Sequence, residues 1–96
     1  MEKQANKILA RSATAGFEEK NDVLITVTPV AAGRGITVKL VSPVQRQYGK
    51  HMEKLIMETV QSAGFSDVTI EAVDKSAWDY TIKARVLGAL ERGMKA

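Results

Sequence analysis

SPVQRQYGKHMEKLIMETVQSAG, residues 42–64, is the stretch that decides the fold of this chain. Ser42 suits a helix N-cap, Pro43 suits the first helical position because no N–H donor is needed there, and Gln45 completes a capping box. Apolar side chains then recur at helical spacing, and a glycine follows where a helix C-terminus favours one. The apolar residues are Val44, Tyr48, Met52, Leu55, Ile56, Val60 and Ala63. This pattern predicts one amphipathic helix over residues 43–63.

Three segments around this helix alternate between apolar and polar residues with a period of two, which is typical of strands. The first covers residues 22–30, where β-branched residues dominate. The second covers residues 36–40, and the preceding segment 31–35 carries two glycines that tolerate positive φ, so these two strands are predicted to pair as a β-hairpin. The third covers residues 68–72 and leads into a turn at 74–77.

The remaining residues complete the predicted order. After the turn, alternating apolar residues favour a short strand over 79–84, and helical spacing favours a helix over 85–94. Residues 1–21 show no sustained strand pattern and are expected to form a flexible N-terminal arm, with helical character from Lys3 to Arg11. The order strand, strand, helix, strand, strand, helix predicts an α+β fold for residues 22–96. We expect a small two-layer sandwich in which both helices cover one face of an antiparallel sheet.

The length and composition of the chain limit the class of protein. A chain of 96 residues can bury one modest core, and its 45% hydrophobic and 26% charged residues are ordinary globular values. No apolar run approaches the roughly 20 residues that span a bilayer, and no secretory signal precedes the first strand. The absence of cysteine excludes disulfides and thiolate catalysis. A cytoplasmic protein without a membrane partner is therefore expected.

The net charge of +3 is concentrated between Arg34 and Lys54, where five basic residues face one acid. Charge alone does not decide whether such a segment meets nucleic acid, a phosphorylated group or an acidic partner. A solvated helix face is the plainest interpretation. Aromatic residues are not interleaved with the segment as a base-stacking platform would need, so nucleic-acid binding is not favoured.

No catalytic motif stands out. His51 is the single histidine and has no second histidine or cysteine with which to bind a metal, so it reads as an exposed structural residue. The carboxylates of Asp74 and Asp79, like the pair Glu18 and Glu19, fall in segments that predict no concave site able to split their pKa values. From spacing alone this is a small domain without an evident active site, and such domains usually act by being bound, carried or modified.

Three stretches resemble a known family. They are ATAGFEE leading into DV (residues 13–23), SPVQRQYG (42–49), and DKSAWD (74–79) followed by Ala84-Arg85. In order and spacing they are similar to the acyl carrier protein, or gamma subunit, of citrate lyase. That family has glycine where this chain has Ser76 and leucine where it has Trp78. The resemblance covers about residues 13–92.

The resemblance implies a carrier subunit of a lyase complex that performs no chemistry itself. In this family a phosphoribosyl-dephospho-coenzyme A arm is attached to a serine through a phosphodiester and carries an acetyl or citryl thioester. The implied partners are an alpha subunit that transfers the acyl group, a beta subunit that cleaves the citryl thioester, and the transferase that attaches the prosthetic group. A tethered arm raises the local concentration of the thioester at both partner sites.

One position departs from the family. With Gly16 and Asp22 in register, the modified serine falls on Lys20, and lysine does not form that phosphodiester. Ser12 is the fallback attachment residue. The alternatives are an engineered form that cannot be modified, or a diverged carrier-like protein that assembles with partners without a prosthetic group. A small nucleic-acid-binding domain is the third hypothesis, and it predicts binding that weakens steeply with salt.

Overall fold

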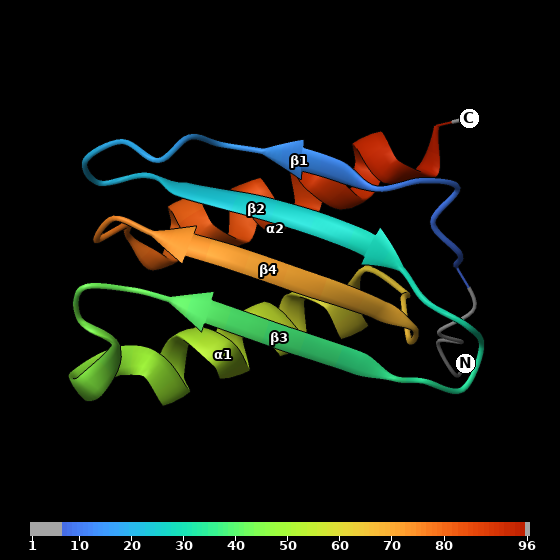
Figure 1. Cartoon of the computed structure of the whole chain (residues 1–96), viewed down its shortest axis with the longest axis horizontal. Helices are drawn as coiled ribbons and strands as arrows, with labels where there is room; N and C mark the ends of the chain where they lie inside the picture. The colour runs from blue at the N-terminus through green and yellow to red at the C-terminus, as the bar shows by residue number, and fades with distance from the viewer. Residues whose placement is uncertain (1–6, 96) are drawn as a thin grey trace.

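The computed structural model describes residues 7–95, which form one sheet covered on one face by two helices (Figure 1). In chain order the elements are β1 (Ala13–Ala15), β2 (Val23–Pro29), β3 (Ile36–Val41), α1 (Gln45–Ser62), β4 (Val68–Asp74) and α2 (Asp79–Met94). The predicted α+β class and the two layers are confirmed. Neither helix in the described part of the chain has both the length and the apolar character that a bilayer crossing requires.

The sheet has the order β1-β2-β4-β3, so the predicted hairpin between β2 and β3 is wrong. β4 lies between them, antiparallel to β2 and parallel to β3, and the sheet is therefore mixed, not purely antiparallel. The glycines before β3 serve a different purpose. The carboxylate of Asp67, just before β4, accepts hydrogen bonds from the N–H groups of Gly33 at 3.0 Å and Gly35 at 2.9 Å. These bonds hold the connection from β2 to β3 where β4 begins.

Two more expectations for the strands are corrected. The segment predicted as a strand over 79–84 is the first part of α2, because the buried residues Ile82 and Val86 follow helical spacing while Trp78 and Tyr80 are exposed. The fourth strand is instead β1, in the segment where no strand was expected. The sequence did not predict β1 because a strand of three residues is too short to show an alternating pattern. Its strand conformation depends on pairing with β2.

The predicted helical character from Lys3 to Arg11 is wrong where it can be compared. Residues 3–6 lie outside the described residues, and residues 7–11 contain no helix. Lys7 instead forms an isolated parallel bridge with Phe65, and its N–H donates to the carbonyl of Gly64 at 3.0 Å. This contact joins the start of the described chain to the end of α1.

Of the two helix ends predicted for α1, the C-terminal one is confirmed and the N-terminal one differs in the structure. Gly64 has a φ of +95°, its N–H donates to the carbonyl of Gln61, and the Phe65 N–H donates to the carbonyl of Val60. The predicted C-terminal glycine therefore closes a Schellman motif. At the other end the helix begins at Gln45, two residues later than predicted. The N-cap is Val44 and no side chain caps the helix, so the prediction of Ser42 as N-cap is wrong. Gln45 Oε1 still accepts the Ser42 N–H at 3.3 Å, but Ser42 Oγ accepts the Val44 N–H, which lies before the helix.

The core lies between the sheet and the two helices. β2 and β4 are the two central strands, and their alternate residues on the face that the helices cover are almost fully buried. α1 and α2 contribute residues at helical spacing from their inner faces. The largest of the fully buried side chains are Phe65, Ile25, Ile56, Ile70, Ile82 and Leu90. This core gives the surface loops at both ends of the sheet a rigid base.

Candidate functional site

The loop that joins β1 to β2, residues 16–22, contains the position singled out by the sequence. It begins at Gly16, whose φ is +88° and where an added Cβ would lie 1.9 Å from the carbonyl oxygen of Val23. Only glycine fits there, because both the backbone conformation and the space exclude a side chain. Near its end, Asp22 N–H donates to the carbonyl of Glu19 at 2.9 Å, which closes a turn around Lys20. Lys20 is exposed at this turn.

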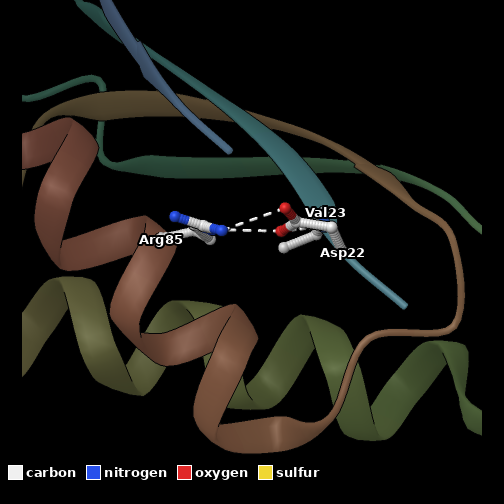
Figure 2. Close-up of polar contacts among 3 residues, drawn as sticks. All are labelled: Asp22, Val23 and Arg85. Carbon is white, nitrogen blue, oxygen red and sulfur yellow. Dashed lines mark hydrogen bonds and ion pairs between the residues drawn. The ribbon is translucent and has the colours of Figure 1, made fainter. Parts of the chain in front are cut away.

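The last residue of this loop is held by an ion pair with α2 (Figure 2). Arg85 donates from Nε to Asp22 Oδ1 at 3.0 Å and from a terminal nitrogen to Asp22 Oδ2 at 2.9 Å. The Val23 N–H donates to Asp22 Oδ1 at 2.7 Å. The hydrogen bond from Arg85 lowers the pKa of Asp22 below its ordinary value of 3.8, against a smaller opposing effect of burial. The paired, two-point contact fixes both residues in orientation.

The turn between β4 and α2 lies directly beside the loop. Asn21 N–H donates to the carbonyl of Lys75 at 2.7 Å, and Lys75 N–H donates to the carbonyl of Asp22 at 2.9 Å. Figure 1 shows both connections at the same end of the sheet. The loop and the turn therefore form one continuous surface, although they are more than fifty residues apart in the chain.

Asp74 organises this turn from the inside. Its side chain is buried, and its carboxylate accepts hydrogen bonds from Ser42 Oγ at 2.7 Å, from Ser76 N–H at 3.2 Å and from Ala77 N–H at 2.9 Å. Through Ser42 it also joins the start of α1 to the end of β4. A buried carboxylate is stable only when such partners replace water. Asp74 is thus a structural residue, a role that the sequence did not reveal.

A surface hollow of about 780 Å³ lies between the starts of α1 and α2. Its lining is largely apolar and includes Tyr48, Met52 and Trp78. His51 Nε2 lies 2.7 Å from Asp79 Oδ2 at this hollow, and both side chains are more than half exposed, at 57% and 60%. Asp74 also borders the hollow, but its oxygens are engaged in the turn. Asp79 therefore pairs with His51, whereas Asp74 is bonded within the turn, and the two carboxylates share no partner.

The other residues singled out from the sequence lie apart from the loop. Ser12 is exposed just before β1, at the end of that strand opposite to the loop. The basic segment is divided among three elements: Arg34 is in the connection before β3, Lys39 is on β3, and the rest lie on the exposed side of α1. It does not form one stripe. Sequence reasoning also missed Arg85 as the partner of Asp22, since their separation of 63 residues carries no local signal.

The fold and this end of the sheet define a class of protein: a small α+β domain that presents a braced, exposed loop. Residues 10–93 match the family model of the malonate decarboxylase delta subunit (MdcD), an acyl carrier protein family. The citrate lyase acyl carrier protein of Halothermothrix orenii is 42% identical over 87 residues, which is 91% of this chain and 90% of the relative. The corresponding protein of Streptococcus mutans is 43% identical over 84 residues, covering 88% and 81%. The chain belongs to this acyl carrier protein family of citrate lyase and malonate decarboxylase.

The fold also has a counterpart among solved structures. A chain in the crystal structure of a Pseudomonas malonate decarboxylase hetero-tetramer in complex with malonate superposes with a TM-score of 0.74. The match covers 93% of this chain and 90% of that chain, at 14% sequence identity. At that identity the likeness shows a shared fold.

Proposed function

We propose that this protein is a carrier subunit of a citrate lyase-type complex, in which the end of the sheet that bears loop 16–22 is offered to larger subunits. The single observation that carries the proposal is the bracing of the loop: its base is fixed by the Asp22–Arg85 ion pair while Lys20 remains exposed. A rigid base with an exposed tip suits a tethered group that must enter pockets on other proteins, because little orientation is lost on docking. The implied partners are an acyl transferase subunit and an acyl lyase subunit in the cytoplasm.

The loop itself does not fit the prosthetic group of the family. A phosphodiester needs a hydroxyl, and residues 16–22, GFEEKND, contain no serine, threonine or tyrosine. On the resemblance described above, Lys20 takes the place of the family's attachment serine, and it offers an amine instead of a hydroxyl. Phosphoribosyl-dephospho-coenzyme A is therefore not attached through this loop. A second candidate function follows from the same observation: a carrier-like assembly protein that docks on lyase subunits without any prosthetic group.

The test is to express the tagged chain in cells that make an active citrate lyase, purify it, and identify both its bound subunits and its intact mass. Recovery of the large subunits together with the mass increment found on the cells' own carrier supports the carrier function. Recovery of the subunits without an increment favours the assembly protein. Failure to recover the subunits would overturn both functions.

A matched pair of variants locates the docking surface. Phe17 lies in the loop with 61% of its surface exposed, and Ile8, at the other end of the sheet, is 81% exposed. We expect Phe17→Glu to reduce recovery of the large subunits and Ile8→Glu to leave it unchanged, because only the first places a charge on the proposed surface. Equal recovery with both variants would contradict the placement of the docking surface at this loop.

A further inference from the structure

We infer that Ser76 is the residue through which this chain accepts a phosphodiester-linked arm, in place of the hydroxyl that loop 16–22 lacks. The inference rests on the proposed carrier function and deepens it, because it names an attachment residue. It begins from the disagreement between the loop and the group that such a carrier would hold.

Ser76 lies beside the loop in space. Lys75, the residue before it, is bonded to the loop through two backbone hydrogen bonds, one from Asn21 N–H and one to the carbonyl of Asp22. An arm that begins at Ser76 therefore starts one residue from the base of the loop. A partner pocket that receives this end of the sheet would therefore be within reach of an arm attached at Ser76, as it would be for an arm attached in loop 16–22.

Among the aliphatic hydroxyls in the β4–α2 turn and at the starts of the two helices, Ser76 is the most accessible. Ser42 is half-buried and donates its hydroxyl to Asp74, and Thr81 is half-buried in the first turn of α2. Ser76 is exposed. The exposed Ser12 precedes β1 at the opposite end of that strand. Thr14 is also exposed and close to the loop, but it lies within β1, paired with Thr26, and on the opposite side of that strand from the buried Ala15. Ser76 is thus the exposed hydroxyl that lies in the turn bonded to the loop, outside the strands of the sheet.

The backbone of Ser76 adds an independent observation. Its φ is +66°, in the left-handed region that a residue with a Cβ adopts only at a cost. The contacts that hold the turn are those from the N–H groups of Ser76 and Ala77 to Asp74, and both would form equally with glycine at position 76. The turn therefore has no need of the hydroxyl, and strained residues of this kind cluster at functional sites.

The attachment is a simple phosphoryl substitution. Ser76 Oγ attacks the phosphorus of a nucleotide-derived arm that is activated as a phosphoanhydride. The new O–P bond forms as the bond from that phosphorus to the anhydride oxygen breaks, the condensed phosphate leaves, and the hydroxyl proton passes to a base of the transferase or to solvent. No oxidant or reductant is needed.

The experiment uses the full chain in cells that make an active citrate lyase, with intact-mass measurement and peptide mapping. Trypsin cleaves after Lys75 and Lys83, so an adduct on Ser76 appears in the peptide 76–83, while one on Ser12 or Thr14 appears in 12–20. We expect the wild-type chain and the matched control Ser12→Gly to carry the increment in peptide 76–83. Ser76→Gly, which relaxes the positive φ and therefore folds, is expected to carry none.

Two outcomes would overturn the inference: an increment that persists in Ser76→Gly, or a wild-type chain that stays unmodified while the cells' own carrier is loaded. The double variant Lys20→Ser with Ser76→Gly separates this failure from failure of the proposed function. If the double variant gains the increment on residue 20 and the wild-type chain does not, Ser76 is rejected while the carrier function stands. Loss of the lyase subunits from every sample would reject the carrier function itself.

Discussion

Arg85, on α2, forms two hydrogen bonds with the carboxylate of Asp22, at 3.0 and 2.9 Å, across a separation of 63 residues. The pair joins the base of loop 16–22 to the helical layer, so the loop and the core cannot move independently while the pair is formed. Asp22 also caps the start of β2 by accepting the Val23 N–H. The carboxylate thus stabilises the position of the loop and the fold together.

Asp22→Ala is expected to lower the free energy of unfolding by about 1–2 kcal/mol, because it removes charge-assisted hydrogen bonds that are partly open to water. Urea unfolding followed by circular dichroism measures the change. Asp79→Ala is the matched control, since Asp79 pairs with His51 at an exposed site and such pairs contribute little. Equal losses in the two variants would show that the Asp22–Arg85 pair stabilises the fold no more than the exposed His51–Asp79 pair.

Acid is expected to remove the contribution of Asp22. Because Arg85 depresses the pKa of Asp22 in the folded state, the contribution is fully present above the unfolded pKa of about 4 and is lost as the pH falls through the folded pKa. The stability difference between the wild-type chain and Asp22→Asn should therefore narrow below about pH 4.

Unfolding in urea from about pH 6 to about pH 2.5 measures this difference. Asp67 also has a lowered pKa, chiefly because the Gly35 N–H donates to it, but it titrates in both proteins and cancels in the comparison. A difference that stays constant over this range would contradict the role assigned to Arg85.

Gly16→Ala and Gly33→Ala separate steric clash from backbone strain, since both glycines have a φ of +88°. At Gly33 the added Cβ meets nothing within 4 Å, so we expect only the left-handed strain, about 1–2 kcal/mol. At Gly16 the Cβ would lie 1.9 Å from the Val23 carbonyl oxygen, and the loss should exceed about 3 kcal/mol. Thermal and urea unfolding measure both, and similar losses would mean that the loop relaxes without cost.

Ser76→Gly is expected to raise the free energy of unfolding by about 0.5–1 kcal/mol, because relief of the positive φ outweighs the added freedom of glycine in the unfolded chain. Lys75→Gly is the matched control. Among the described residues Lys75 does not have a positive φ, so glycine there should lower stability by about 0.5–1 kcal/mol. Calorimetry or urea unfolding measures the stability of both variants. A loss of stability in Ser76→Gly would contradict the proposal that the positive φ of Ser76 strains the turn.

The candidate site was only partly predictable. The sequence pointed to Gly16, Asp22 and Lys20 through their resemblance to a family motif, and the structure places all three in one exposed loop. The sequence did not indicate that Arg85 holds Asp22 or that the turn around Ser76 lies against the loop. Both relationships depend on the packing of α2 and on the position of β4, which no local pattern encodes.

The sequence by itself determined what depends on neighbouring residues: the long helix α1, its glycine terminus, and the strands β2, β3 and β4. Capping and periodicity act within a few positions, so they can be recognised without knowledge of the fold. Only the tertiary structure decided which strands pair. β2 adjoins β4 instead of β3, and Asp67 holds the intervening connection, because strand order minimises the free energy of the whole sheet and its helical layer. The same nonlocal packing brings residues 16–22 and 74–77 together into one surface.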